Sequence, residues 1–350
     1  MSRSLLPNLN RKSILITGGT GSFGQKFCKG ILDAFNPERV IIYSRDEYKQ
    51  ADMANMESFQ HPCMRFFLGD VRDKERLTLA MSDVDVVVHA AALKQVPAAE
   101  YNPYEFIKTN IHGATNVVEA ALNAGVGKVL ALSTDKAVNP VNLYGATKLC
   151  SDKLFMAANS YRGKKRSTRF SVVRYGNVIG SRGSVVPLFL EQKKTGALSL
   201  TDMRMTRFYI TLEQSVQFIF RCIQEMEGGE LFVPKMPSCR LTDLAMAIAP
   251  ECEHNVVGIR PGEKIHETLI PSDEAYRTLE FPDHFIVQPV LPCWETSFEK
   301  SGGRPCAEDF CYRSDVNSSW LDAESLKPLI EKYVNSEEAI SAGVLEPASV

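Results

Sequence analysis

Short apolar runs alternate with longer amphipathic stretches through the first half of the chain. The short runs predict buried strands, which lie at Ser13–Thr17, Val40–Tyr43, Met64–Leu68, Val84–Val88 and Lys128–Leu132. Between them, apolar residues recur at helical spacing, most clearly over 23–35, 103–123 and 140–158. Strands separated by helices predict βαβ units, and right-handed crossovers arrange such units as an α/β fold with a doubly wound parallel sheet.

The pattern loosens after a sixth predicted strand at Phe170–Val173. Helical periodicity returns over 185–195 and 211–227, and short strands are expected near 198–200 and 231–233. We therefore expect three parts: a doubly wound domain over 1–180, a smaller lobe over 181–290 with some crossing of the chain between the two, and an extension over 291–350. The extension carries few periodic segments, and its role is not evident from its residues.

Composition and charge narrow the class of protein. The chain has 350 residues, 44% of them hydrophobic, and its 40 Lys and Arg residues nearly balance 42 Asp and Glu residues. This balance argues against a nucleic-acid partner. No apolar run is long enough to insert in a membrane, and the N-terminus lacks a signal-peptide pattern. Nine Cys without a C-x-x-C pair and six scattered His favour a cytoplasmic protein with free thiols and no metal.

A glycine-rich loop follows the first predicted strand and opens the first predicted helix. It reads G-x-x-G-x-x-G over 18–24. Glycines let the backbone approach a pyrophosphate, and the helix N-terminus offers free N–H groups. A Walker-type loop would need Gly-Lys, but Gln25 follows Gly24; a purely structural turn is the other alternative. The loop predicts a dinucleotide-binding Rossmann domain with contacts from Gly18, Thr20, Gly21, Ser22, Phe23 and Gly24.

The residues after the second predicted strand discriminate between NAD and NADP. An acidic residue there would bind the ribose 2′-hydroxyl of NAD. Ser44 and Arg45 stand at that place instead, and Lys49 follows one helical turn later. A hydroxyl and two cations suit a 2′-phosphate, so we expect NADP as the cofactor. Asp46 and Glu47 come slightly late, and their alternative role is to cap the next helix.

Two further strand ends complete the predicted cofactor site. Asp70 and Val71 close the third strand, where the Asp70 carboxylate could accept a hydrogen bond from the adenine amino group. Alternatively, Asp70 only caps the helix that begins near Asp73. Ala90 and Ala91 follow the fourth strand and are expected beside the cofactor.

Tyr144 and Lys148 form a Y-x-x-x-K pair inside a predicted helix. Residues four apart lie on one helical face, one turn from each other. An ammonium beside a phenol stabilises the phenolate, lowers the Tyr pKa and makes the phenol a usable base near neutral pH. The pattern is common, but its place after the fifth strand puts it at the carboxyl edge of the sheet. We therefore expect both residues to act in catalysis and to contact the nicotinamide end of the cofactor.

The fifth strand ends in a second group of reactive side chains. Thr134, Asp135 and Lys136 stand where open α/β sheets place their active sites. A plain alcohol dehydrogenation needs only a tyrosine, a lysine and a hydroxyl. An additional acid and base indicate additional proton chemistry, such as elimination or epimerisation, although a loop salt bridge would use the same residues.

The chain resembles the extended short-chain dehydrogenase/reductase superfamily and, more closely, the inverting UDP-N-acetylglucosamine 4,6-dehydratases of the pseudaminic acid type. The resemblance covers about 13–290 but not the Cys-rich end. It is carried by ILITGGTGSFG, YSRDE, GDVRD, HAAALKQVP, STDKAVNPVNLYGATK, RYGNVIGSRGSVVPLF, MTRFYITLEQ and RPGEKIHETLI. It implies that 1–180 bind NADP and that 181–290 bind the substrate.

The resemblance also implies a reaction sequence. Hydride would leave C4 of the sugar for NADP⁺ while Tyr144 takes the hydroxyl proton. Lys136 would then remove the C5 proton and Asp135 would protonate the departing 6-hydroxyl, although the reverse assignment is chemically possible. Hydride would return to C6, and C5 would be reprotonated from the opposite face, giving the L-arabino 4-keto sugar. Lys136 as base would need a lowered pKa, which we expect from Lys148, and Thr134 would supply a hydroxyl contact.

The substrate side is implied by the same resemblance. Arg207 and Arg260 would bind the diphosphate and uridine of UDP-N-acetylglucosamine, Glu263 the ribose and Asn177 the first phosphate. Lys94, after the fourth strand, would lie near both sugar and cofactor.

Two alternative functions remain open, and one state of assembly is expected. A UDP-sugar 4-epimerase or ketosugar reductase would use the same fold, but neither needs the elimination that the Asp-Lys pair suggests. A non-catalytic NADP-sensing scaffold would not need the reactive side chains at all. The family commonly forms multimers, so a homo-oligomer is expected.

Overall fold

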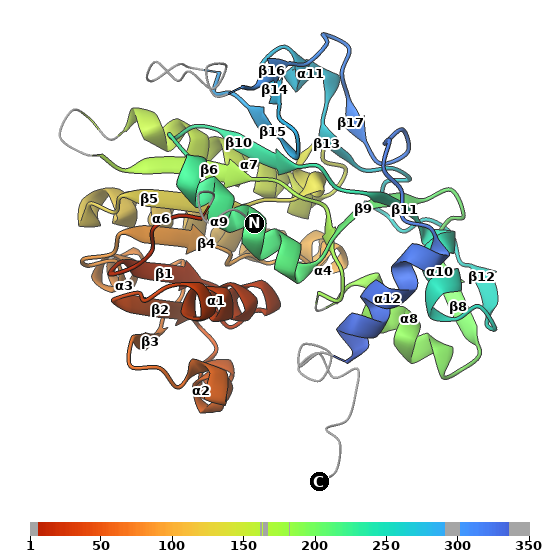
Figure 1. Cartoon of the computed structure of the whole chain (residues 1–350), viewed down its shortest axis with the longest axis horizontal. Helices are drawn as coiled ribbons and strands as arrows, with labels where there is room; N and C mark the ends of the chain where they lie inside the picture. Colours follow the sequence, from red (N-terminus) through yellow and green to blue (C-terminus); the bar gives the residue numbers. More distant parts are fainter. Residues whose placement is uncertain (1–5, 162, 164–166, 182, 291–301, 336–350) are drawn as a thin grey trace.

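The structure, a computed structural model, describes residues 6–161, 163, 167–181, 183–290 and 302–335. A ten-stranded sheet runs through it (Figure 1), with the strand order β16-β14-β15-β10-β6-β5-β4-β1-β2-β3. Seven neighbouring strands are parallel. They are β3 Met64–Leu68, β2 Arg39–Ser44, β1 Ser13–Thr17, β4 Val86–His89, β5 Lys128–Leu132, β6 Arg169–Val173 and β10 Leu231–Pro234. The order 3-2-1-4-5-6 within them is that of the doubly wound Rossmann fold, which confirms the predicted fold class.

The other edge of the sheet is antiparallel. β15 pairs with β10 and β14, and β14 pairs with β16. These strands are β15 His284–Val287, β14 Thr278–Glu280 and β16 Arg304–Pro305. Because β16 lies beyond residue 290, the C-terminal segment adds a strand to the main sheet.

Helices cover the parallel strands in two sets. α1 packs against α9, whereas α3 packs against α6 and α6 against α7. Their bounds are α1 Ser22–Ala34, α2 Glu47–Asn55, α3 Lys74–Ala80, α4 Val96–Tyr101, α6 Gly113–Ala124, α7 Leu143–Ala157 and α9 Leu212–Glu225. Short 3₁₀ turns lie at Glu57–Phe59, Asp135–Ala137 and Ala158–Ser160. The long connections between parallel strands are thus filled by helices, as the sequence pattern predicts.

Two predicted helices differ from the pattern. The stretch 103–123 is not one regular helix, because a π-helical turn over Ile107–His112 separates α5, Pro103–Phe106, from α6. In this turn Asn110 exchanges hydrogen bonds with the backbone N–H and C=O of Leu93, both at 2.9 Å. The stretch 140–158 becomes helical only at Leu143, because Asn142 caps α7 by accepting from the Gly145 N–H at 2.7 Å.

A smaller lobe has its own apolar core. It contains α8 Val185–Lys193, β8 Ala197–Leu200, α10 Leu241–Ile248, β12 Glu253–Val256 and α12 Ala323–Val334. Two short sheets join it to the main sheet: β7 Asn177–Val178 with β9 Thr206–Ile210 and β11 Ser238–Arg240, and β13 Thr268–Ile270 with β17 Tyr312–Arg313. α11 spans Ser272–Ala275. The chain crosses more than once, since α9 and β10 of the 181–290 stretch belong to the main sheet layer (Figure 1).

The C-terminal helix α12 is part of the lobe's core. Leu326, Ile330 and Tyr333 are buried there against α10. A β-carbon on Gly180 would lie 2.1 Å from the Tyr333 ring, so close packing requires glycine at that position. The described part of the C-terminal extension, residues 302–335, is therefore packed into the fold. The sequence pattern did not predict this packing. No helix in the described part of the chain is long and apolar enough to cross a membrane.

The packing of α12 predicts a stability effect. Leu326 is 0% exposed, so Leu326→Ala should leave a cavity and lower the free energy of unfolding by about 2–5 kcal/mol. Urea denaturation followed by circular dichroism measures the change. Lys327→Ala, at the neighbouring solvent-facing position, is the control and should change stability by less than about 0.5 kcal/mol. Equal stability of the Leu326 variant and the wild type would contradict the packing.

Candidate active site

The carboxyl ends of the parallel strands open into one large cavity between the sheet and the smaller lobe. Its volume is about 1600 Å³. This exceeds the roughly 300–1,000 Å³ typical of a site for one small ligand, so two ligands side by side would fit. Every predicted site residue lines the cavity except Asp135, which is fully buried behind its wall.

The glycine loop fits a pyrophosphate. Gly18 has a φ of +67°, and a β-carbon there would lie 2.9 Å from the Ala91 backbone. A β-carbon on Gly24 would lie 2.5 Å from the Gly19 backbone, so helix α1 approaches the loop after β1 as closely as its atoms permit. Gly21 caps α1 without a side-chain hydrogen bond, and the first turn of α1 faces the cavity. Backbone N–H groups of this turn could therefore bind phosphate oxygens.

The cations expected at the 2′-phosphate end lie beside carboxylates in the structure. Arg45 is 3.7 Å from Asp70 and Lys49 is 2.8 Å from Asp46, and both cation side chains are largely exposed. Asp46 also accepts from the Lys49 backbone N–H at 3.1 Å, which confirms its helix-capping role. The Ser44 hydroxyl accepts a hydrogen bond from a glutamine of α2 at 3.1 Å.

The Asp70 carboxylate is engaged by a residue that the sequence analysis missed. Arg72 donates to it from its backbone N–H at 2.9 Å and from its guanidinium at 3.0 and 2.7 Å. The alternative role of Asp70 as a helix cap is wrong, because Asp73 caps α3 by accepting from the Arg76 N–H at 2.9 Å. Asp70 still lines the cavity.

The Lys136 ammonium lies between two carboxylates. Its Nζ is 3.0 Å from Asp135 Oδ1, 3.7 Å from Glu267 Oε1 and 3.4 Å from Asn177 Oδ1. Burial alone would lower the pKa of Lys136, but the charges of Asp135 and Glu267 outweigh it and raise that pKa. The expectation that Lys148 lowers this pKa is therefore wrong. Two carboxylates, and not a second ammonium, dominate the surroundings of Lys136.

Tyr144 and Lys148 lie one turn apart on α7, and both face the cavity. Burial raises the pKa of Tyr144 to about 12, while the charge of Lys136 and a hydrogen bond with Thr134 act to lower it. Lys148 Nζ donates to the carbonyl oxygen of Leu132 at 2.7 Å. In this structure the cation that stabilises the Tyr144 phenolate is thus Lys136, where the sequence predicted Lys148.

A buried polar network supports the helix that carries Lys148. The Ser133 hydroxyl donates to Asp152 at 2.6 Å, and Arg174 lies 3.9 Å from Asp152 and donates to Glu274 at 2.9 Å. Burial lowers the pKa of Lys148, whereas the charge of Asp152 opposes this shift. In this network the positive charge of Arg174, directly after β6, compensates the buried carboxylates of Asp152 and Glu274.

The predicted substrate contacts line the same cavity as the glycine loop. Arg207 donates to the backbone carbonyls of Thr206, Lys264 and Ile265 at 2.8–3.0 Å, so its guanidinium also holds the 264–265 backbone. Arg260 has a 53% exposed side chain that lies 3.9 Å from Glu263.

Lys94 also lines the cavity, and its pKa is lowered by desolvation and by the charge of Lys136. Lys94, which we predicted to lie near the sugar, is thus close enough to Lys136 for the two charges to interact.

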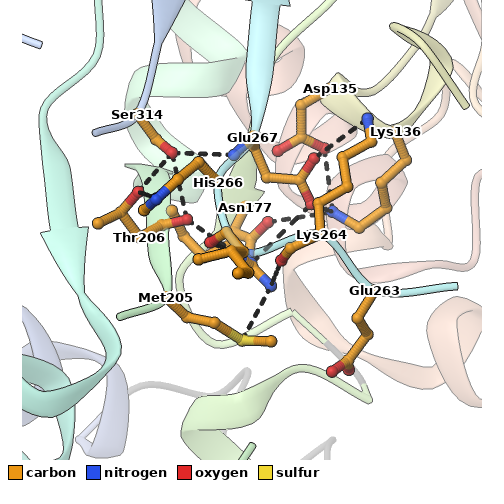
Figure 2. A network of polar contacts seen from close by, with 12 residues as sticks. Asp135, Lys136, Asn177, Met205, Thr206, Glu263, Lys264, His266, Glu267 and Ser314 are labelled. Atoms are coloured by element: carbon orange, nitrogen blue, oxygen red, sulfur yellow. Dashed lines mark hydrogen bonds and ion pairs between the residues drawn. The ribbon is translucent and has the colours of Figure 1, made fainter. Parts of the chain in front are cut away.

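Further groups of the site were not anticipated from the sequence (Figure 2). Glu267 and Lys264 lie in the loop before β13, where Glu267 approaches Lys136 at 3.7 Å and Lys264 approaches Glu267 at 3.6 Å. Ser314 comes from the C-terminal segment. The motif RPGEKIHE contains Lys264 and Glu267 and could have identified them. No three His, Cys, Asp or Glu side chains among the described residues are grouped as a metal site requires.

The fold and the site together define a short-chain dehydrogenase/reductase of the extended type. The chain matches the family described as polysaccharide biosynthesis protein over residues 14–289. It is 54% identical over 329 residues to a UDP-N-acetylglucosamine 4,6-dehydratase (inverting) of Campylobacter jejuni, covering 92% of this chain and 98% of that protein. The chain belongs to this polysaccharide biosynthesis family and, within it, to the inverting 4,6-dehydratase group.

Two other similarities extend the comparison. The structure resembles that of Pen from Bacillus thuringiensis, with a TM-score of 0.84, 37% identity and coverage of 93% of this chain and 98% of that one. A UDP-glucose 4-epimerase of Rickettsia conorii is 43% identical over 286 residues, covering 79% of this chain and 82% of that protein. The Campylobacter match is long enough to continue beyond residue 290, so the extension that the sequence analysis left unmatched has a counterpart there.

The close approach at Gly24 predicts an effect on dinucleotide affinity. Gly24→Ala should push α1 away from the loop after β1 and weaken NADPH binding by at least about tenfold, measured by fluorescence titration. Gly30→Ala in the same helix is the control, because its β-carbon would meet side-chain atoms of Val216 at 3.1 Å and no backbone. Unchanged affinity of the Gly24 variant would mean that this loop does not bind the dinucleotide.

Proposed function

We propose that this protein is an NADP-dependent UDP-N-acetylglucosamine 4,6-dehydratase that inverts C5. The observation that carries the proposal is the pairing of Lys136 and Asp135 at 3.0 Å beside Tyr144, at the edge of one cavity. A dehydrogenase acting on an alcohol alone has no use for that pair, whereas removal of water across C5 and C6 needs an acid and a base. The 54% identity to the Campylobacter enzyme supports the same reaction.

The residues at the glycine loop would hold the dinucleotide. The first turn of α1 would bind the pyrophosphate, Asp70 and Val71 would adjoin the adenine, and Arg45 and Lys49 would exchange their present carboxylate partners for the 2′-phosphate. Bound NADP⁺ would supply the acceptor for hydride from C4 and return it to C6. Ser44, Ala90, Ala91 and Lys94 line the same part of the cavity.

Tyr144 would take the proton of the 4-hydroxyl. A phenol with a pKa of about 12 is protonated at rest, so proton transfer requires stabilisation of the phenolate. Lys136 supplies a positive charge, and Thr134, whose hydroxyl donates to Asp135 at rest, would turn this hydroxyl toward the phenolate. Lys148, on the same helical face, would hold the nicotinamide ribose and add positive charge to this side of the cavity.

Lys136 and Asp135 would move the protons of the elimination. Lys136 rests as an ammonium, so it first passes a proton to Asp135, which gives an amine and a carboxylic acid. The amine then takes the C5 proton that the 4-keto group has made acidic. The acid returns a proton toward the 6-oxygen as water leaves, by way of Thr134 or Lys136, the cavity-lining groups that contact it. A solvent-derived proton at the opposite face of C5 completes the inversion.

The substrate would occupy the cavity between the catalytic groups and the smaller lobe. We assign the diphosphate and uridine to Arg207 and Arg260, the ribose to Glu263 and the first phosphate to Asn177. Lys94 would lie near the sugar. This assignment makes 1–180 the NADP-binding part and 181–290 largely the substrate-binding part. We also propose that the enzyme acts in the cytoplasm as a homo-oligomer and supplies deoxy-amino sugars for glycans of the pseudaminic acid type.

One other catalytic function has a specific observation in its favour. The Rickettsia relative at 43% identity is described as a UDP-glucose 4-epimerase. Epimerisation at C4 would use Tyr144 and the dinucleotide and leave Lys136 and Asp135 without a proton-transfer role. A ketosugar reductase or an NADP-binding scaffold would likewise leave this pair unused.

Incubation with UDP-N-acetylglucosamine in heavy water, followed by proton NMR, tests the proposed function. We expect a new C6 methyl signal, deuterium at C5 and the L-arabino configuration. Tyr144→Phe should lower turnover by about 10²–10⁴-fold without unfolding the protein. Formation of the C4 epimer without a methyl group would establish the epimerase instead, and a methyl group with retained C5 configuration would refute inversion.

The exposed cations at the 2′-phosphate end predict cofactor preference. Arg45→Ala should reduce the NADP over NAD affinity ratio by about tenfold or more, since a charge-assisted phosphate contact is lost. Isothermal titration with both dinucleotides measures the ratio. Arg11→Ala, at a surface position outside the cavity lining, is the control. A ratio equal to that of the wild type would remove Arg45 from the site.

A further inference from the structure

Glu267 is a buried carboxylate among three cations (Figure 2). It is 3% exposed, and its Oε1 lies 3.7 Å from Lys136 Nζ and 3.9 Å from Arg207 Nε. Its Oε2 lies 3.6 Å from Lys264 Nζ and has no hydrogen-bond partner among the described residues. A carboxylate taken out of water is costly unless neighbouring charges compensate it. Electrostatic attraction to this cation group therefore compensates the burial of the Glu267 carboxylate.

Two of the three cations are already fixed by the backbone. Arg207 donates to the carbonyls of 206, 264 and 265. Lys264 Nζ donates to the carbonyl of Val138 at 2.5 Å. Within the described part of the chain, the partners of the remaining cation, Lys136 Nζ, are all side chains: Asp135 at 3.0 Å, Asn177 at 3.4 Å and Glu267 at 3.7 Å. Glu267 therefore constrains Lys136 more than it constrains the other two.

A serine of the C-terminal segment fastens Glu267 in this position. The Glu267 N–H donates to Ser314 Oγ at 2.9 Å, and the Ser314 N–H donates to the Glu267 carbonyl at 2.9 Å. Ser314 Oγ also lies 2.7 Å from the Thr206 hydroxyl, and Ser314 is fully buried. Ser314, from the segment beyond residue 290, thus joins Glu267, just before β13, to Thr206 of β9.

We propose that Glu267 is a positioning residue that holds the Lys136 ammonium opposite Asp135, and that Ser314 keeps Glu267 in place. The proposal rests on the function proposed above for Lys136. Two carboxylates within 4 Å of one ammonium fix both its location and its charge. Whether Lys136 acts as base or as acid, the pH at which it changes protonation state then depends on Glu267.

The sign of this dependence follows from the groups around Lys136. Two anions favour its protonated form, and nearby cations oppose it. The charged and titratable groups that face this cluster are Asp135, Glu267, Arg207, Lys264, Lys94, Tyr144 and Tyr209. Removing the charge of Glu267 leaves one anion against the same cations, so Lys136 should lose its proton at lower pH. An opposite charge within about 4–6 Å of an ionisable group shifts the pH at which that group titrates by about 1–3 units.

A labelling experiment measures the pH at which Lys136 loses its proton, and it does not require turnover. The Lys136 side chain is 28% exposed toward the cavity, so a small amine-acylating reagent can reach its neutral form. Peptide mass spectrometry of the intact enzyme, labelled over a pH series, gives the pH at which Lys136 becomes reactive. In Glu267→Gln this pH should fall by about 1–3 units. An unshifted labelling profile would overturn the proposal, whether or not the protein turns over UDP-N-acetylglucosamine.

Kinetics give the second readout. The limb of the kcat–pH profile that reports Lys136 should move to lower pH in Glu267→Gln and return toward the wild-type position in Glu267→Asp. Glu263→Gln is the matched control: it removes a carboxylate from the same loop that contacts Arg260, so it should raise KM and leave the limb in place. A similar limb shift in both glutamine variants would mean that overall charge, and not position, is responsible.

Ser314→Ala tests the anchor. It should lower kcat several-fold with a smaller limb shift than Glu267→Gln, because the carboxylate remains but its backbone loses a hydrogen-bond acceptor. Wild-type kcat would overturn the role of Ser314. If Glu267→Gln does not fold, as judged by circular dichroism, the labelling comparison is made with Ser314→Ala, which should lower the pH at which Lys136 becomes reactive by a smaller amount; a wild-type labelling profile there would contradict the proposal. Shifted labelling without any dehydration would uphold the positioning role and refute the proposed function.

Discussion

The structure depends on compensation of buried charge where the sheet meets the smaller lobe. Asp135 and Glu267 are almost completely excluded from solvent, and Lys136 lies between them. Neither carboxylate could be buried without cations, because desolvation would outweigh every contact it makes. Arg207 and Lys264 supply further positive charge from the lobe. The ion cluster thus joins segments distant in sequence and forms part of the wall of the cavity in which the chemistry is proposed to occur.

A second buried network lies behind the first and serves a different purpose. Asp152 joins Ser133 at the end of β5 to Arg174 at the end of β6. Burial lowers the pKa of Lys148, and the charge of Asp152 in the same network opposes this decrease. α7 is consequently held by charge on its buried side while Tyr144 faces the cavity. Rigid support of this kind keeps proton donors and acceptors at hydrogen-bonding range, which general acid–base catalysis requires.

Local pattern predicted much of the fold and part of the cavity wall. The six strands of the first half formed within two residues of their predicted bounds, because each is a short, mainly apolar run; five of them are buried in the sheet, and β3 lies at its edge with exposed residues. The interrupted helix near Asn110 was not foreseen, since its cause is a hydrogen bond to a distant loop. The C-terminal segment was missed for a similar reason. The roles of α12 and Ser314 depend on tertiary contacts: α12 packs in the core of the lobe, and Ser314 accepts a hydrogen bond from Glu267.

The sequence by itself determined the doubly wound sheet, the glycine loop and the positions of Tyr144 and Lys136, because strand periodicity, glycine spacing and one-turn helical spacing are local properties. Tertiary structure alone decided the electrostatics. The sequence placed Lys148 beside Tyr144 and Lys136 as the group that would lower both pKa values, whereas folding brought Glu267 to Lys136 and directed Lys148 to a backbone carbonyl. A pKa depends on every charge within a few ångströms and on burial, and both are properties of the folded chain.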